Sequence, residues 1–387
     1  MDRIAHLTSL VVLGATGSIG RQTLDVAASL GLDVVALAAN RATDEFASLA
    51  AAHPVAALAL SGASDGERSA LSGQFGTRIA FGPDAVAALA AIPGATVVNG
   101  IVGAAGLEPS VSALQAGNRL ALANKETLVA GGPVVIAAAE SGGGELIPVD
   151  SEHSALWQSL VGEDPNTVRK LILTASGGPF RGRSAAELAS VTVAEALAHP
   201  TWDMGPRITI DSSTLMNKAF EVIEAHYLFG IGYDDIDVVV HPQSVVHSLV
   251  EYVDGSVKAQ LGDPDMRVPI QYAITYPGRS AAPIGPLDLT GGPLTFYEPD
   301  RRAFPCLDLG YAAGRRGGSA PAVLNAADEV AVAAFLDHRI AYQDIARVAE
   351  TTLDTVDHRD ITGVADVLAV DAEARRVAAS VVGSGGR

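Results

Sequence analysis

The sequence predicts an α/β protein with an N-terminal doubly wound, Rossmann-like parallel sheet, a central α/β domain and a C-terminal helical bundle. An apolar strand at residues 9–13 leads into a glycine turn and then a helical segment, the order found in nucleotide-binding βαβ units. Strand-like and helix-like segments then alternate to about residue 145, which favours a parallel sheet. From residue 320, helical periods follow one another with short turns between them. The expected divisions are a sheet domain at 1–145, a central domain at 146–277, a linker rich in Gly and Pro at 278–302, and a helical domain at 303–387.

Length and charge limit the function classes. A chain of 387 residues is long enough for two or three domains. With 26 basic and 44 acidic residues, its formal charge of −18 argues against nucleic acid or an anionic membrane as a partner, since both need a basic face. The single cysteine, Cys306, excludes an internal disulfide and fits a reducing compartment. The uncharged stretch 85–107 is interrupted by Pro93-Gly94 and Asn99-Gly100, so we expect no membrane span and a cytoplasmic protein.

The glycine turn Gly14-Ala-Thr-Gly-Ser-Ile-Gly20 is the first candidate binding site. Between a strand and a helix, it places backbone N–H groups and the positive end of a helix dipole at a pyrophosphate. The contacts expected within it are Thr16, Gly17, Ser18 and Ile19.

The second strand ends in Ala39-Asn40-Arg41, and these residues indicate which dinucleotide binds. An acid there would suit the ribose diol of NAD, whereas a basic residue suits a 2′-phosphate, so NADPH is preferred. The alternative is that Arg41 is an ordinary loop cation.

Asn124-Lys125-Glu126 follows another predicted strand of this sheet. Lys125 therefore sits just beyond the carboxyl end of a strand, where ligands of doubly wound sheets bind. The alternative is a surface lysine that pairs with Glu126.

Asp150 and Glu152 form a candidate metal site. They follow the strand-like run 146–149, and side chains two apart in an extended segment point the same way, so both carboxylates could hold one hard cation. The candidate third ligand is Glu221, on a helix expected to run from Asp211 to Tyr227. One stripe of that helix carries Thr214, Asn217, Lys218, Glu221 and Glu224, and a solvated helix face is the alternative reading.

Ser176-Gly177-Gly178 follows a predicted strand at residues 170–174 and is a candidate anion site. Glycines at such a turn let backbone amides and a serine hydroxyl approach an anion closely. With Ser212, Asn217 and Lys218, Ser176 could form a phosphate pocket in which Lys218 supplies the positive charge. Taken alone, the Ser-Gly-Gly sequence is simply a turn.

The proline-bounded loop from His199 to Pro206 carries the large side chains Trp202 and Met204. Such a loop is either pinned to a core or used as a lid over a ligand. Downstream, His247 is interpreted as a possible hydrogen-bonding partner of the substrate and His241 as structural.

Together these motifs resemble one family along nearly the whole chain, the 1-deoxy-D-xylulose 5-phosphate reductoisomerases. The similar stretches are Gly14-Ala-Thr-Gly-Ser-Ile-Gly, Leu122-Ala-Asn-Lys-Glu, Pro148-Val-Asp-Ser-Glu-His, Ser176-Gly-Gly-Pro-Phe-Arg, Met216-Asn-Lys, His241-Pro-Gln-Ser-Val-Val-His and Gly262-Asp-Pro-Asp-Met-Arg. One departure is at Ala39-Asn40-Arg41, where many relatives carry glycine and lysine. This leaves open which side chain meets the 2′-phosphate.

The resemblance implies a homodimer, a phosphosugar substrate, NADPH, and Mg²⁺ or Mn²⁺. It implies Asp150, Glu152 and Glu221 as metal ligands, and a phosphate site of Ser176, Ser212, Asn217 and Lys218. Further implied contacts are Lys125, Ser151, Glu152, Glu221, His199 and His247 for the substrate, His199, Trp202 and Met204 in the lid, and Asn124, Glu126 and Gly205 for the cofactor.

The implied reaction is a retro-aldol and aldol rearrangement followed by reduction with NADPH, giving 2-C-methyl-D-erythritol 4-phosphate for non-mevalonate isoprenoid synthesis. Two other classes compete with it. Another NADP-dependent dehydrogenase would need no metal, and a dinucleotide-sensing regulator would show no turnover.

Overall fold

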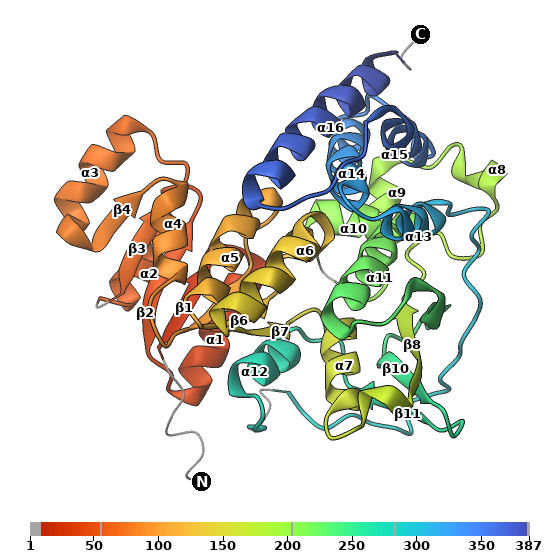
Figure 1. The fold of residues 1–387 in the computed structure, drawn as a ribbon, viewed down its shortest axis with the longest axis horizontal. Helices are drawn as coiled ribbons and strands as arrows, with labels where there is room; N and C mark the ends of the chain where they lie inside the picture. The colour runs from red at the N-terminus through yellow and green to blue at the C-terminus, as the bar shows by residue number, and fades with distance from the viewer. Residues whose placement is uncertain (1–8, 55, 203, 282–283, 385–387) are drawn as a thin grey trace. The chain divides into compact units, whose positions relative to one another are not determined.

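The computed structural model describes residues 9–54, 56–202, 204–281 and 284–384 (Figure 1). The chain divides into two compact units. The first unit comprises Met1–Thr127, Val134–Ser154 and Asp265–Pro286, and the second comprises Leu128–Pro133, Ala155–Pro264 and Leu287–Arg387. None of the helices in the described part of the chain combines the length and apolar character that a membrane-spanning helix needs. The expected boundaries near residues 145, 277 and 302 stay a prediction.

A seven-stranded, wholly parallel sheet forms the centre of the first unit, in the order β4-β3-β2-β1-β5-β6-β7. The strands are β1 (Leu10–Leu13), β2 (Val34–Ala39), β3 (Ala57–Leu60), β4 (Ile79–Phe81), β5 (Thr96–Asn99), β6 (Arg119–Leu122) and β7 (Glu145–Pro148). Because β1 lies between β2 and β5, the order reverses there, which is the switch point where doubly wound sheets bind ligands. The predicted Rossmann-like sheet is confirmed.

The helices of this unit follow the strands in alternation. They are α1 (Ser18–Leu30), α2 (Asp44–Ala52), α3 (Asp65–Phe75), α4 (Pro83–Ala90), α5 (Leu107–Gln115), α6 (Lys125–Gly142) and, from much later in the chain, α12 (Arg267–Thr275). α12 packs against α1, β6 and β7. Arg119 on β6 donates hydrogen bonds to the carbonyl oxygens of Ile274 (3.2 Å) and Tyr276 (2.7 Å), which fixes the end of α12 to the sheet.

The second unit contains a four-stranded mixed sheet in the order β11-β10-β8-β9. Its strands are β8 (Val168–Ala175), β9 (Ile236–Val240), β10 (Val246–Tyr252) and β11 (Val257–Leu261). β8 and β9 are parallel, whereas β10 pairs antiparallel with both β8 and β11. Its helices before the C-terminal group are α8 (Ala185–Leu188), α9 (Val193–Ala196), α10 (Pro206–Thr214) and α11 (Met216–Phe229), while α7 (Ser151–Leu160) spans the division between the units.

The C-terminal part of the second unit is helical, as predicted. It consists of α13 (Cys306–Arg316), α14 (Ala320–Leu336), α15 (Asp344–Thr355) and α16 (Val364–Ser384), with α14 packed against α13, α15 and α16 (Figure 1). α14 is apolar nearly all round and is buried along most of its length, as expected of the central helix of a bundle.

The helix predicted from Asp211 to Tyr227 is wrong in its bounds. α10 starts earlier, with Pro206 in its first turn, and ends where Leu215 adopts a left-handed backbone (φ 62°) before α11 begins. The Leu215 side chain is buried, and the Met216 amide donates to the Thr214 hydroxyl (3.3 Å) across the break. Tertiary burial of a leucine thus outweighs the local preference for a continuous helix, which periodicity alone does not reveal.

Candidate functional site

The glycine turn after β1 packs closely on β5 and α1. Gly14 has φ 78°, and a Cβ there would lie 2.7 Å from the carbonyl oxygen of Gly100 at the end of β5. A Cβ on Gly20 would lie 2.3 Å from the Gly14 carbonyl oxygen, so α1 packs directly on the turn. Gly17 and Ser18 are exposed at the start of α1, and Thr16 and Ile19 are half-buried beside them. This geometry leaves helix N-terminal amides available to a phosphate at the switch point.

The candidate residues after β2 also lie at this edge of the sheet. Ala39 is buried, whereas Asn40 and Arg41 are exposed. The Ser61 hydroxyl, just after β3, donates to the Asn40 side-chain oxygen (3.1 Å) and fixes that amide. Ser61 received no role from the sequence, because it lies outside any glycine motif. Its position after the neighbouring parallel strand was the available signal.

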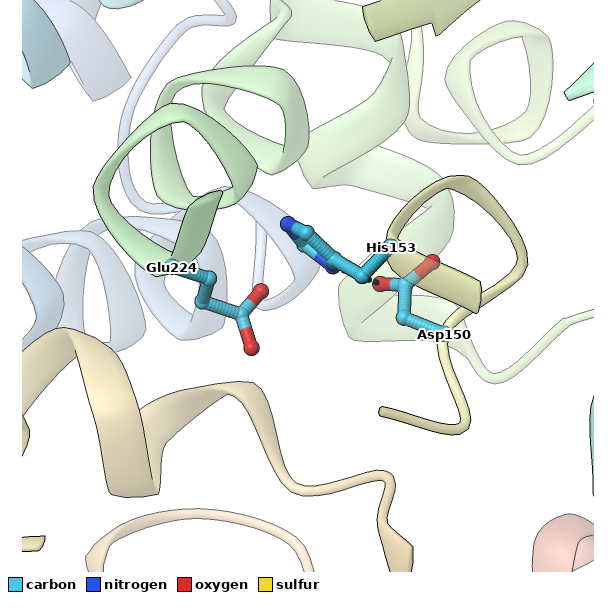
Figure 2. Close-up of side chains that lie close together, drawn as sticks. All are labelled: Asp150, His153 and Glu224. Atoms are coloured by element: carbon cyan, nitrogen blue, oxygen red, sulfur yellow. Dashed lines mark ion pairs between the residues drawn. The ribbon is translucent and has the colours of Figure 1, made fainter. Parts of the chain in front are cut away.

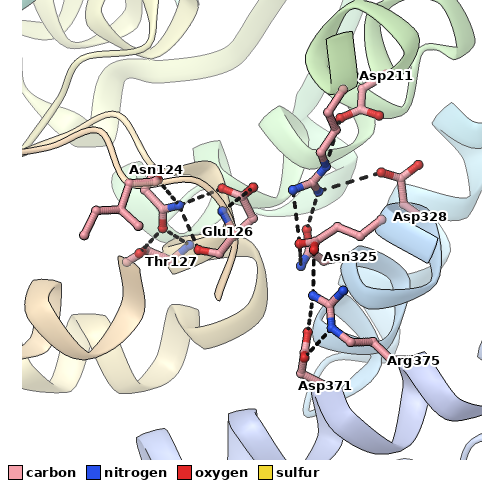
Figure 3. A network of polar contacts seen from close by, with 12 residues as sticks. Asn124, Glu126, Thr127, Asp211, Asn325, Asp328, Asp371 and Arg375 are labelled. Carbon is pink, nitrogen blue, oxygen red and sulfur yellow. Dashed lines mark hydrogen bonds and ion pairs between the residues drawn. The ribbon is translucent and has the colours of Figure 1, made fainter. Parts of the chain in front are cut away.

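Asn124, at the start of α6, holds the loop after β5 (Figure 3). Its side-chain nitrogen donates to the Ile101 carbonyl (2.7 Å) and to the Glu126 carboxylate (2.7 Å), and its oxygen accepts the Thr127 amide (2.9 Å). Glu126 in turn accepts the Gly103 amide (3.0 Å). Asn124 and Glu126, which were expected to contact the cofactor, therefore link the loop after β5 to the loop after β6, beside the glycine turn.

Lys125 forms an ion pair with Asp150, which follows β7. This partner differs from Glu126, the alternative considered for a surface lysine. Both side chains are mostly buried, with exposed fractions of 13% and 16%. Figure 2 shows Asp150 beside the buried His153 at the start of α7, and His153 Nδ1 lies 3.9 Å from the Asp150 carboxylate. His153 lies within the predicted metal motif, yet the sequence assigned it no role.

The expectation that Asp150 and Glu152 alternate along an extended segment is wrong. α7 begins at Ser151, and the Ser154 amide donates to the Asp150 carbonyl (2.8 Å), so Asp150 precedes the helix and Glu152 lies in its first turn. The buried Ser151 hydroxyl donates to the Glu152 carboxylate (2.5 Å). An alternating pair at Asp150 and Glu152 would need the strand to continue to Glu152, but β7 ends at Pro148. From Ser151 on, the backbone N–H and C=O groups form helical hydrogen bonds instead.

In the second unit, Ser176 and His199 are in direct contact. Ser176 Oγ lies 3.0 Å from His199 Nε2, while His199 Nδ1 accepts the amides of Thr201 (3.2 Å) and Trp202 (2.9 Å). Since Nδ1 is an acceptor, the proton of the neutral ring is on Nε2 and points at Ser176. Burial lowers the pKa of His199, which favours this neutral form.

The Ser176 turn also approaches the end of α10. Gly178 has φ 63°, its amide donates to Ser176 Oγ (3.2 Å), and a Cβ on it would lie 3.1 Å from the Ser212 carbonyl oxygen. Two of the four expected phosphate contacts, Ser176 and Ser212, thus lie on adjoining segments. Gly205, an expected cofactor contact, is exposed at the other end of α10.

The polar stripe of α11 is buried. Lys218 pairs with Glu221 one helical turn away, and Asn217 donates to the other Glu221 oxygen (2.7 Å). Lys218, Glu221 and Glu224 are at most 4% exposed, so the alternative of a solvated helix face is excluded. A buried carboxylate held by an ammonium and an amide is a strong anionic group in a low-dielectric setting.

The two histidines after β9 occupy different settings. His241 is fully buried, Nδ1 lies 2.9 Å from the Thr295 carbonyl and Nε2 accepts the Val245 amide (3.2 Å), as expected of a structural histidine. The His247 ring centroid lies 6.3 Å from that of Trp202. Trp202 and Met204 are half-buried in the loop between α9 and α10.

Three family models match the chain. They are described as 1-deoxy-D-xylulose 5-phosphate reductoisomerase (residues 10–132), its C-terminal domain (146–229) and DXP reductoisomerase C-terminal domain (261–377). Among curated relatives, the reductoisomerase of Methylobacillus flagellatus is 51% identical, covering 95% of this chain and 96% of its own. That of a Cyanothece species is 49% identical, covering 96% and 98%.

Solved structures with this name share the fold. The Zymomonas mobilis reductoisomerase in complex with NADPH has a TM-score of 0.89 at 43% identity, covering 97% of this chain and 98% of that one. A second reductoisomerase, in complex with NADPH, fosmidomycin and magnesium, has a TM-score of 0.90 at 39% identity with the same coverage.

Proposed function

The chain belongs to the 1-deoxy-D-xylulose 5-phosphate reductoisomerase family, and we propose that it carries out this family's reaction. The substrate is 1-deoxy-D-xylulose 5-phosphate, the product is 2-C-methyl-D-erythritol 4-phosphate, and NADPH and a divalent metal are required. One observation carries the proposal. The carboxyl edge of the parallel sheet holds both the glycine turn and the Lys125–Asp150 pair, so dinucleotide and metal chemistry meet at one edge.

NADPH fits the glycine turn, because Gly14 and Gly20 let β5 and α1 pack closely on the turn while Gly17 and Ser18 stay exposed at the start of α1. The amides of Ser18 and Ile19 bind the pyrophosphate, with Thr16 and Gly17 beside them. Arg41 and Asn40 face the 2′-phosphate, and Arg41 supplies the positive charge. Asn124, Glu126 and Gly205 are the remaining proposed contacts.

The proposed metal ligands are Asp150, Glu152 and Glu221. Their carboxylate oxygens are the donor set that Mg²⁺ or Mn²⁺ prefers. When bound, the ion acts as a Lewis acid on substrate oxygens. Lys125 pairs with Asp150 and Lys218 pairs with Glu221, so each ammonium group lies beside one of these carboxylates and would be close to substrate oxygens bound to the ion.

The phosphate of the substrate is proposed to lie between Ser176, Ser212, Asn217 and Lys218. His199 Nε2–H orients the Ser176 hydroxyl, and Ser151 and His247 bind the sugar. The loop carrying His199, Trp202 and Met204 is the proposed lid that excludes water from the reacting fragments.

Two further proposals concern the oligomeric state and the cellular location of the enzyme. We infer a homodimer, supported by the exposed edge strand β11 and by exposed apolar side chains of the same unit at Leu289, Phe296 and Tyr297. Sedimentation at several concentrations tests it, and a monomer at all of them would contradict it. Cytoplasmic location is supported by the single, buried cysteine.

The test of function is NADPH oxidation with 1-deoxy-D-xylulose 5-phosphate, with and without EDTA. We expect turnover that EDTA abolishes and Mg²⁺ restores. Turnover that persists without metal would favour another NADP-dependent dehydrogenase. NADPH binding with no turnover of this substrate would favour a dinucleotide-sensing regulator.

A further inference from the structure

A partly buried network of charged side chains joins α10 to α14 (Figure 3), and within it Asp211 and Asp328 are buried. The Arg207 guanidinium on α10 lies 3.1 Å from the Glu329 carboxylate and donates to the Asn325 side-chain oxygen (3.0 Å). It lies farther from two other carboxylates, 3.7 Å from Asp211 on its own helix and 3.8 Å from Asp328 on α14.

The network continues to α16 and contains more acids than bases. Arg375 donates to Glu329 (2.6 Å) and binds Asp371 through two hydrogen bonds (2.6 and 3.0 Å). Two arginines therefore face four carboxyl groups, those of Asp211, Asp328, Glu329 and Asp371. If all four were ionised, two net negative charges would lie among packed helices, where desolvation makes uncompensated charge expensive.

Asp328 is the carboxyl group that is suited to hold a proton. It is fully buried, and neither of its oxygens accepts a hydrogen bond from any described residue. Its pKa is raised well above the ordinary value of 3.8, first by burial and then by the Asp211 charge, with Arg207 opposing and Glu329 adding to the rise. Cys306 on α13 also faces the pair, but burial raises the pKa of its thiol, so it adds no charge. The Arg207 guanidinium lies within 4 Å of both Asp211 and Asp328, so these two carboxyl groups on α10 and α14 face the same cation.

We propose that Asp328 is a positioning residue for the phosphate end of the substrate: its carboxylic acid O–H donates to the Asp211 carboxylate and fixes α10 against α14. The proposal rests on the proposed phosphate site, because Ser212 follows Asp211 on α10. This helix has only nine residues and ends at the left-handed Leu215, so its placement depends on contacts with its neighbours. The Tyr342 hydroxyl donates to the Ser213 carbonyl (2.6 Å), a second anchor from the helical part of the unit.

The proton on Asp328 makes stability depend on pH with a definite sign. In the unfolded chain the group ionises near its ordinary pKa, whereas in the folded protein it keeps its proton to higher pH. Between these two values the folded state binds more protons, so raising the pH destabilises it. Asp328→Asn keeps a hydrogen-bond donor for Asp211 and cannot ionise, so its stability should not fall in this way as the pH rises.

Thermal unfolding between about pH 5 and 9 tests the proton directly. We expect Asp328→Asn to melt above wild type, with a margin that grows with pH to at least about 3 °C. Asp371→Asn is the matched control, because Asp371 accepts two hydrogen bonds from Arg375 and the amide loses both charge-assisted contacts. It should melt below wild type at every pH. An Asp328→Asn protein that melts below wild type at neutral pH, or a margin independent of pH, overturns the proposal.

Kinetics with the phosphosugar test the positioning role. Asp328→Ala should raise the KM for the phosphosugar by about fivefold or more with kcat nearly kept, and Asp328→Asn should restore the wild-type KM. An unchanged KM in Asp328→Ala overturns the positioning role even if the melting data agree. Wild-type turnover with the phosphosugar decides the proposed function separately, since melting requires no activity.

Discussion

Two lysine–carboxylate pairs among the proposed site residues have the same chemistry in different surroundings. Lys125 and Asp150, at the edge of the parallel sheet, are 13% and 16% exposed, whereas Lys218 and Glu221 on α11 are 4% and 1% exposed. The more deeply a pair is buried, the more stability is lost when one partner is removed, because the remaining charge is farther from water. Asp150 and Glu221 are therefore proposed ligands of the same metal, yet they should differ in how much they contribute to the stability of the fold.

The largest expected effect comes from neutralising the buried carboxylate. Glu221→Gln leaves the Lys218 charge poorly compensated and should lower the free energy of unfolding by roughly 3 kcal/mol. Asp150→Asn should cost less than Glu221→Gln, because the Lys125–Asp150 pair is less deeply buried. Both should lose nearly all turnover, since each removes a proposed metal ligand. Urea unfolding and turnover measured on the same preparations check this.

A second substitution shows whether the lost stability comes from the buried charge. Lys218→Met in the Glu221→Gln background should recover part of the stability, because it removes the uncompensated ammonium. The comparison between the two pairs fails if Asp150→Asn and Glu221→Gln destabilise the fold equally.

Phosphosugar binding provides the next largest effect. Lys218→Ala should weaken use of 1-deoxy-D-xylulose 5-phosphate by about 2 kcal/mol, roughly 30-fold in kcat/KM, through loss of a charge-assisted contact. The unphosphorylated sugar is the control, and its much lower kcat/KM should change little. If both sugars suffer equally, Lys218 acts through Glu221 and not through phosphate.

At the exposed edge of the first unit, Arg41→Ala should raise the KM for NADPH about tenfold, equivalent to about 1.4 kcal/mol, and leave that for NADH nearly unchanged. Only NADPH carries the 2′-phosphate. Arg347→Ala on α15, which removes an arginine paired with Asp344, is a matched control expected to affect neither cofactor. Equal effects of Arg41→Ala on both cofactors would move the contact elsewhere.

The smallest expected effect concerns the loop of His199. Because burial lowers the pKa of His199, the folded state favours the neutral ring, and acidification below its ordinary pKa of 6.5 progressively costs stability. Protonation at Nδ1 removes the acceptor of the Trp202 amide. In a Trp157→Phe background, Trp202 emission should therefore change on acidification to about pH 5, and His199→Gln should abolish this transition. An identical acid transition in His199→Gln would assign it to another group.

Sequence reasoning worked where position in the chain determines position in space. The apolar strands of the parallel sheet end at one edge, so the glycine turn, Asn40-Arg41 and Lys125 could be placed together from strand ends alone. Asp150 was not placed there, because the strand before it was assigned to the central domain, whereas β7 pairs with β6 in the parallel sheet. The sequence analysis was wrong about α7 and α10. The helix α7 already begins at Ser151, where the Ser154 amide bonds to the Asp150 carbonyl. The helix α10 ends at Leu215, whose buried side chain goes with a left-handed backbone. Sequence reasoning could not predict the Asp328 network, since an acid within an apolar helical period carries no sign of what packs against it.

The central proposal is that Asp150, Glu152 and Glu221 hold one divalent ion. Mn²⁺ binding followed by electron paramagnetic resonance tests it most directly, because it reports the ion without requiring turnover. We expect one tightly bound Mn²⁺ per chain in the wild type, and loss of that binding in Asp150→Asn, Glu152→Gln and Glu221→Gln, each checked to be folded. Wild-type affinity and stoichiometry in any one of the three variants would contradict the shared site.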